Sequence, residues 1–102
     1  MNQYIITDEA IQDLKDISEY FLQNNLEAGE SFLNHFNARC HQLVSFPNLG
    51  RSYSHVREDL RGPTLRGFIL IYRVTRRNDN ISIEILSIVN GRRNLAEVFS
   101  ED

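Results

Sequence analysis

The sequence contains little cysteine and no long apolar run. Its single cysteine, Cys40, excludes an intramolecular disulfide and any zinc site built from several cysteines, and one unpaired thiol suits a reducing compartment. The longest apolar run covers only residues 68–72, far short of a membrane span, and the first residues lack the basic and apolar segments of a signal peptide. We therefore expect a cytoplasmic protein that has no contact with a membrane.

Proline is also scarce. The two prolines, Pro47 and Pro63, are too few for a fibrous or disordered chain, and no repeat or linker divides the sequence. With 102 residues, of which 41% are hydrophobic and 25% charged, the chain has the composition of an ordinary globular domain. A chain of this size can bury one core but not two, so residues 1–102 are expected to form a single domain.

The charged residues are unevenly distributed. The net charge of -3 argues against a simple nucleic-acid coat protein. Residues 1–50 carry seven acids and two bases, residues 51–93 carry nine arginines and four acids, and the tail from Asn94 adds three acids. Lys15 is the only lysine, so ten of the eleven bases are arginine, whose planar group forms bidentate contacts with carboxylates and phosphates. The positive charge is therefore concentrated in the second half of the chain.

The first half of the chain predicts a strand and an amphipathic helix. Residues 4–6 are a short apolar strand, and Thr7 is a suitable N-cap, with Asp8 and Glu9 in the first helical turn. Apolar residues then recur at helical spacing until about Gln23, at Ala10, Leu14, Ile17 and Phe21.

A second helix follows after a very short turn. Asn24 is predicted to cap it, with Glu27 three residues later completing a capping box. Pro47 ends it, because the residue before a proline is disfavoured in the helical region. The apolar stripe contains Phe32, Leu33, Phe36, Cys40, Leu43 and Val44. Two such helices lie antiparallel, and their apolar faces need a sheet or a partner to cover them.

The second half of the chain predicts that sheet. Residues 68–75 are rich in β-branched and aromatic side chains and are apolar on both faces, which is typical of a central strand. A polar turn at 76–80 precedes an alternating run at 81–89, so the two form an antiparallel hairpin. Residues 60–65 are at best an edge strand because of Gly62 and Pro63, and Leu95, Val98 and Phe99 suggest a short final helix. The expected fold is α+β, ordered β-α-α-β-β-β, with a helical hairpin packed on a small, mainly antiparallel sheet.

No catalytic motif, metal ligand set or cofactor site is recognisable. Phosphate-binding loops, nucleophile elbows and metal-binding His-Glu helices are absent. His35 and His41 are six residues apart and point to different faces of the second helix, while His55 lies in a loop, so each is interpreted as a surface histidine. Cys40 lies on an apolar helix stripe and is interpreted as a core residue with a raised pKa.

The arginines are the remaining signal. Arg61, Arg66 and Arg73 lie on or beside the predicted sheet, and Arg92 and Arg93 follow its last strand. If the strands are neighbours, these side chains can share one surface. The alternative is that each arginine keeps its strand soluble or pairs with an acid of the first helix.

An ordered set of residues spans nearly the whole chain and includes the Pro-x-x-Gly-Arg element at 47–51 and the Gly-Arg-Arg ending at 91–93. The first helix contributes Thr7, Ala10, Asp13, Leu14, Ile17 and Tyr20, the second Ala28, Phe32, Cys40 and Leu43, and the sheet and its end Gly67, Tyr72, Arg73, Ile83, Leu95 and Phe99. No single motif is decisive, but the set as a whole resembles one known family, the ParE branch of the RelE/ParE toxin superfamily of bacterial type II toxin-antitoxin systems, also called plasmid stabilisation system proteins.

The resemblance implies a toxin that a cognate ParD-like antitoxin neutralises by wrapping a flexible C-terminal segment around it. ParE members poison DNA gyrase, whose A subunit is the expected target, so DNA would be reached only through the antitoxin or the gyrase complex. RelE members instead cut messenger RNA on the ribosome, using basic residues together with tyrosine, histidine or glutamate. Asn90 stands where many relatives carry histidine, and an amide cannot act as a general base at neutral pH.

The leading hypothesis is therefore a ParE-like gyrase inhibitor that acts by binding, without a catalytic residue, metal or cofactor. A ribosome-dependent endoribonuclease and a non-toxic antitoxin-binding module remain the alternatives. Leftover apolar surface at Tyr20, Leu26 or Phe46 is a further candidate for antitoxin contact. The candidate residues for contact with target or antitoxin are Arg61, Arg66, Arg73, Asn90, Arg92 and Arg93.

Overall fold

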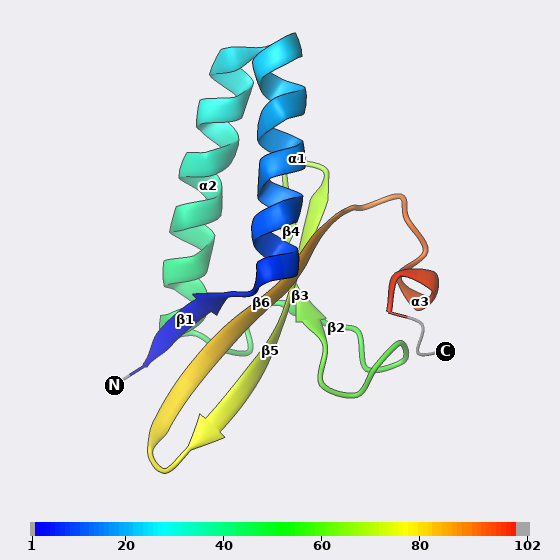
Figure 1. The fold of residues 1–102 in the computed structure, drawn as a ribbon. Coiled ribbons are helices and arrows are strands. Elements are labelled where there is room, and N and C mark those ends of the chain that lie inside the picture. The colour runs from blue at the N-terminus through cyan, green and yellow to red at the C-terminus, as the bar shows by residue number, and fades with distance from the viewer. Residues whose placement is uncertain (1, 100–102) are drawn as a thin grey trace.

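The computed structural model describes residues 2–99, in which a helical hairpin packs on a six-stranded sheet (Figure 1). Strand β1 (Gln3–Ile6) leads into helices α1 (Asp8–Asn24) and α2 (Leu26–Ser45). Strands β2 (Arg51–Ser52), β3 (Arg61–Gly62), β4 (Thr64–Leu65), β5 (Phe68–Arg77) and β6 (Asn80–Asn90) follow, and α3 (Leu95–Val98) comes last. Glu101 and Asp102 of the acidic tail lie outside the described residues.

The sheet is mixed but mostly antiparallel. Its strand order is β1-β6-β5-β3-β2, with β4 also paired to β5. Strand β1 runs parallel to β6, and every other pair is antiparallel. The predicted α+β class and the central position of β5 are therefore confirmed. Within residues 2–99, none of the helices combines the length and the apolar character that crossing a membrane requires.

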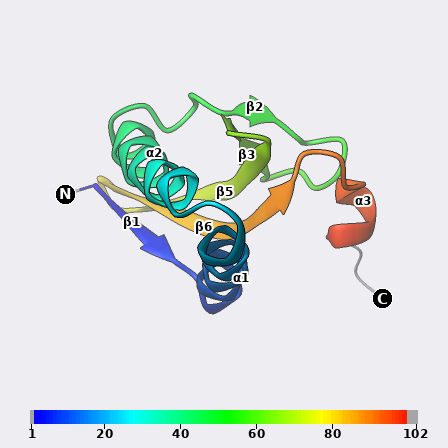
Figure 2. The same cartoon turned by 90° about the horizontal axis from the view of Figure 1, so that it is seen from above.

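Both faces of the sheet are covered, which explains why β5 is apolar on both sides. On one face Leu70 and Tyr72 pack against the α1–α2 hairpin, with Phe32 and Cys40 among its buried side chains. On the other face Ile69, Ile71 and Val89 pack against Tyr53, Leu60 and Leu95 from the loop after β2 and from α3. Seen from above, the two long helices lie side by side, and α3 stands apart from them near the C-terminal end (Figure 2).

The helix caps follow the sequence with one correction. Thr7 caps α1 as predicted, since its side chain accepts the Ala10 N–H at 3.3 Å and also donates to the Ile85 carbonyl at 2.8 Å. The predicted cap of α2 at Asn24 is wrong, because α1 continues through Asn24. The extended residue is Asn25, whose side chain accepts the Ala28 N–H at 3.1 Å while its own N–H still donates to the Phe21 carbonyl. One asparagine therefore ends α1 and begins α2.

The strands are longer and more numerous than the sequence pattern predicts. Pro63 divides the expected edge strand at 60–65 into β3 and β4, because it has no N–H for a ladder bond. The polar turn is only Asn78 and Asp79, since Arg76 and Arg77 still pair within the β5–β6 hairpin. The two-residue strand β2 was not expected at all.

Asp13 ties α1 to β6 beyond the end of β1. Strand β1 pairs with β6 only from Ser82 to Ile85, so within the described chain the edge of β6 at Ser87 and Ile88 has no strand neighbour on that side. The Asp13 carboxylate accepts a hydrogen bond from the Ser87 hydroxyl at 2.7 Å and from the Ile88 N–H at 2.9 Å. A charged acceptor from the helix thus occupies the place of the missing strand partner.

Tyr72 attaches the segment after α2 to the middle of β5. Its side chain is fully buried, and its hydroxyl donates to the Pro47 carbonyl at 2.6 Å and accepts the Gly50 N–H at 3.1 Å. A Cβ at position 50 would lie 2.8 Å from the tyrosine ring, so the close approach requires glycine. This contact determines where the chain enters β2.

We expect Tyr72→Phe to destabilise the protein by about 1–3 kcal/mol, because it leaves the carbonyl of Pro47 and the N–H of Gly50 without their buried partner. Urea unfolding followed by circular dichroism measures the change. Tyr20→Phe is the matched control, since Tyr20 is 60% exposed and its loss of a hydroxyl should cost less than about 0.5 kcal/mol. Equal stabilities of the two variants would contradict the anchoring role of Tyr72.

Candidate functional site

The six residues selected from the sequence do not form a single surface. Arg66, Asn90 and Arg92 line one groove, and Arg93 lines another. Arg73 lies between ion-pair partners on the sheet face opposite the helical hairpin, and Arg61 is bonded to the chain beside β3. The structure therefore brings three of the six together.

The first groove, here called the α1 groove, lies between α1 and the adjoining ends of β5 and β6. It has a volume of about 750 Å³. Helix α1 contributes Asp16, Ile17, Tyr20 and Phe21, the β4–β5 turn and the start of β5 contribute residues 66–68, and the end of β6 contributes residues 90–92. An apolar interior with arginines at its edge is suited to a ligand that carries both apolar and anionic groups.

Two glycines fix the positions of the arginines in the α1 groove. The Gly91 N–H donates to the Gly67 carbonyl at 2.9 Å, and a Cβ at position 91 would lie 3.2 Å from that same oxygen. Arg66 precedes Gly67 and Arg92 follows Gly91, so this one hydrogen bond brings the two arginines to the same edge. The Asn90 side chain accepts the Arg92 N–H at 2.9 Å, which shapes the turn that presents Arg92.

The second groove, here called the α3 groove, contains residues that the sequence did not single out as a site. It has a volume of about 400 Å³ and is lined by Arg51, Tyr53, His55 and Arg93, among others. The Arg51 guanidinium lies 5.7 Å from the Tyr53 ring centre, and the His55 ring lies 6.0 Å from the same ring. Of these residues, the sequence marked only Arg51 and Arg93, as parts of the Gly-Arg and Gly-Arg-Arg elements. The others could not be found from the sequence, because the folding of the loop after β2 decides which side chains meet there.

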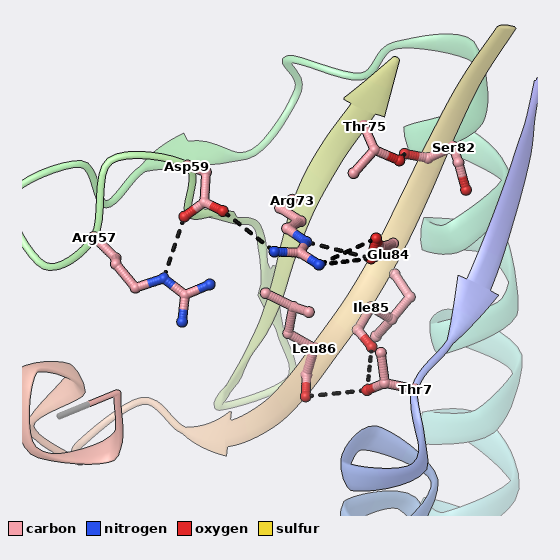
Figure 3. Close-up of polar contacts among 9 residues, drawn as sticks. All are labelled: Thr7, Arg57, Asp59, Arg73, Thr75, Ser82, Glu84, Ile85 and Leu86. Carbon is pink, nitrogen blue, oxygen red and sulfur yellow. Dashed lines mark hydrogen bonds and ion pairs between the residues drawn. The ribbon is translucent and has the colours of Figure 1, made fainter. Parts of the chain in front are cut away.

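Arg73 is held in a chain of ion pairs on the sheet face opposite the hairpin (Figure 3). It contacts Glu84 on β6 at 3.1 Å and Asp59 at 3.7 Å, and Asp59 also contacts Arg57 at 3.3 Å. The hydrogen bond and charge of Glu84 raise the pKa of the Arg73 guanidinium. The expected alternative of pairing with helix acids is wrong for Arg73, since both partners come from the second half of the chain.

Opposing effects act on the pKa of Asp59. Desolvation by itself would raise the pKa of Asp59, but the hydrogen bond and charge of Arg57, a backbone hydrogen bond and the charge of Arg73 outweigh it, so the pKa lies below its ordinary value. Arg61 is also occupied, because it donates to the Asn48 carbonyl at 3.0 Å, while its buried Nε has no partner within the described chain. Arg61 and Arg73 are thus bonded within the described chain, whereas Arg66, Arg92 and Arg93 line the grooves.

The histidines, the cysteine and the exposed apolar side chains lie where the sequence suggested. His35 is bonded to Ser31 on an exposed part of α2, and His41 packs against the Tyr4 ring. Burial raises the pKa of the Cys40 thiol to about 12, as expected for a core cysteine. Apolar surface is also available, with exposed fractions of 60%, 58% and 66% for Tyr20, Leu26 and Phe46. Among residues 2–99, no three metal-ligating side chains gather in one place.

Comparison with known proteins gives a consistent picture. A model of the family described as "ParE toxin of type II toxin-antitoxin system, parDE" matches residues 4–95. A curated protein of Caulobacter vibrioides, Toxin ParE3, is 31% identical over 97 residues, which cover 94% of this chain and 93% of that protein. The solved structure titled "Chromosomal ParDE TA system from P. aeruginosa" superposes with a TM-score of 0.71 at 22% identity, covering 88% of this chain and 96% of that one, and therefore shares the fold.

We expect Arg57→Gln to raise the pKa of Asp59 toward its ordinary value, because the variant removes a hydrogen bond and a positive charge. Since the folded-state pKa is lowered, Asp59 stabilises the protein above its unfolded pKa, and this contribution is lost as the pH falls through the folded-state pKa. The loss at neutral pH should be below about 0.5 kcal/mol, because the Arg57 and Asp59 side chains are 33% and 44% exposed and water screens the pair.

Carboxyl NMR titration of Asp59 measures this shift. Arg76→Gln is the control, because Arg76 is an exposed arginine on β5 that takes no part in the ion-pair chain. An unchanged Asp59 pKa in the Arg57 variant would show that the pair does not persist in solution.

Proposed function

Because the chain belongs to the ParE toxin family of type II toxin-antitoxin systems, we propose that it poisons DNA gyrase by binding the A subunit of that enzyme and that a cognate ParD-like antitoxin neutralises it. The toxin would trap the cleaved DNA complex and so block replication. The Caulobacter relative is itself named a toxin, and the structural neighbour is titled a ParDE system, which supports a toxin paired with an antitoxin.

Neither Asn90 nor Tyr72 is suited to act as a general acid or base, and this observation favours inhibition over RNA cleavage. Cleavage of RNA needs a group that takes a proton from the ribose 2′-hydroxyl and another that protonates the leaving oxygen. The Asn90 amide is neither an acid nor a base at neutral pH and its oxygen accepts the Arg92 N–H, while the Tyr72 hydroxyl is buried between Pro47 and Gly50. No histidine is among the described residues that line the α1 groove. Its arginines are suited to hold anions by charge and hydrogen bonds.

One observation supports the alternative, a ribosome-dependent endoribonuclease. His55 is an exposed histidine that shares the α3 groove with Arg51 and Arg93. An imidazole beside two guanidinium groups has the elements of a general base with charge stabilisation at phosphate. Because Arg51 and Arg93 form no ion pair within residues 2–99, both remain available to a phosphate.

The main proposal predicts that purified protein inhibits DNA supercoiling by gyrase and increases the amount of cleaved gyrase-DNA complex. A gel assay with relaxed plasmid, gyrase and ATP measures both effects. Protein unfolded by heat is the control. Unchanged supercoiling and cleavage would refute gyrase as the target. Expression without growth loss, combined with binding to the product of the adjacent gene, would instead support the non-toxic antitoxin-binding module.

We expect His55→Gln to change growth inhibition by less than about twofold, because a gyrase inhibitor needs no general base. An endoribonuclease would lose about 10²- to 10⁴-fold in cleavage. Transcript integrity during growth arrest, followed by primer extension, distinguishes the two cases. Cut transcripts that become intact in the His55 variant would overturn the gyrase proposal in favour of RNA cleavage.

A further inference from the structure

Building on the proposed poisoning of gyrase, we infer that the α3 groove holds the phosphate backbone of the DNA that gyrase has cleaved. Arg51 and Arg93 donate hydrogen bonds to phosphate oxygens of that DNA, and gyrase supplies the rest of the affinity. The inference rests on the proposed function and adds to it a direct contact between this protein and DNA.

The lining of the α3 groove contains arginine and no carboxylate. Arg51 and Arg93 are both exposed, and within residues 2–99 no aspartate or glutamate lines this groove. By contrast, Asp16 lines the α1 groove, and Glu84 lines a groove of about 580 Å³ beside the β5–β6 turn. An anion that enters the α3 groove therefore meets two guanidinium groups and no like charge from the lining.

The two arginines of the α3 groove have unused hydrogen-bond donors. Within the part of the chain that the structure describes, neither side chain forms a hydrogen bond or an ion pair, whereas Arg61 and Arg73 are both bonded. The Arg51 guanidinium instead lies 5.7 Å from the centre of the Tyr53 ring. Stacking on an aromatic ring leaves the N–H groups at the edge of a guanidinium free, and these groups bind phosphate in a bidentate manner.

Contacts within the fold hold the backbone on both sides of the α3 groove. On one side, Arg51 is paired in the β2–β3 ladder. On the other side, the Arg93 N–H donates to the Asn90 carbonyl at 3.0 Å. Tyr53 and Leu95, each two residues further along the chain from one of the arginines, are buried in the same core cluster. The arginines therefore stand on a preformed frame, and binding requires little ordering of the backbone.

The surface of the α3 groove suits a phosphate backbone better than an acidic peptide. Its large apolar side chains, Tyr53, Ile69 and Leu95, are only 8–9% exposed, so they offer little surface for apolar groups of a peptide to cover. The α1 groove differs, since its Tyr20 is 60% exposed. Arginines beside little apolar surface are typical of contacts to phosphate. The proposed target supplies such a ligand, because gyrase holds DNA while it is being poisoned.

The small number of arginines in the groove agrees with the acidic character of the whole chain. Two arginines neutralise about two phosphates, which is too few for stable binding to free DNA. The net charge of -3 further opposes non-specific binding. The contact therefore forms only after gyrase has brought the protein and the DNA together.

The first test measures how much cleaved gyrase-DNA complex the purified protein accumulates in the gel assay. We expect Arg51→Gln and Arg93→Gln each to raise the concentration needed for half-maximal accumulation by about tenfold, because each removes a charge-assisted bond to phosphate. Arg76→Gln is the matched control, since it removes the same charge from an exposed arginine of β5 outside the α3 groove, and it should act like the unaltered protein.

The second test changes the DNA and leaves the protein unaltered. Uncharged methylphosphonate linkages replace single phosphates near the cleavage site, one position at a time, and cleavage by gyrase alone is the reference at each position. At one or two positions, the uncharged linkage should weaken the effect of the unaltered protein by about tenfold. The same linkage should cause little further loss with the Arg51 or Arg93 variant, because the bond is already missing.

The outcomes separate this inference from the function on which it rests. Weaker accumulation with both arginine variants, together with a non-additive effect at the same phosphate, supports it. Normal accumulation with both variants, or additive effects at every phosphate, overturns it while gyrase stands as the target. Loss of binding to the adjacent gene's product, with accumulation retained, also overturns it, since the groove would then serve the antitoxin. If the unaltered protein leaves gyrase unaffected, the proposed function fails and the inference fails with it; transcripts cut only when both arginines are present would then assign the groove to RNA.

Discussion

The buried hydroxyl of Tyr72 is the contact on which the arrangement of the second half of the molecule depends. It joins the turn after α2 to the centre of β5 through Pro47 and Gly50, residues more than twenty positions away in sequence. The chain that leaves this anchor forms β2, which pairs with β3, which in turn pairs with β5 opposite Tyr72 itself. The position of Arg51, and hence one wall of the α3 groove, therefore follows from a hydrogen bond made in the core.

A complementary contact organises the helical face. Asp13 accepts hydrogen bonds from Ser87 and Ile88 of β6, and Thr7 donates to the carbonyl of Ile85, two residues before Ser87 on the same strand. Helix α1 is attached to β6 at the start of the helix and near its middle. Its remaining turns therefore extend past the end of the sheet, where Ile17, Tyr20 and Phe21 line a groove together with the β4–β5 turn. The α1 groove thus results from the attachment of the helix to the strand, with its apolar floor as the uncovered end of the hairpin core.

These two contacts also explain how far the sequence could predict the structure. Helices α1 and α2 and strands β5 and β6 have long periodic patterns, so their type and order follow from the sequence. The boundary between the helices was displaced by one residue because Asn24 and Asn25 are adjacent and equally suited to a cap. Strands β2, β3 and β4 have two residues each, too short for any periodicity, and exist because β5 provides their pairing partners. The sequence shows where the candidate arginines are, but only the long-range contacts of the fold reveal which of them are bonded to other residues.

In the structure, six arginines from the second half of the chain fall into three groups. Arg73 and Arg61 satisfy acids and carbonyls and contribute to the fold, whereas Arg51 and Arg93 border a groove with His55, and Arg66 and Arg92 border one with exposed aromatics. Net charge is therefore a poor guide to the partners of this chain, because acidic α1 and the basic edge of the sheet face the same groove.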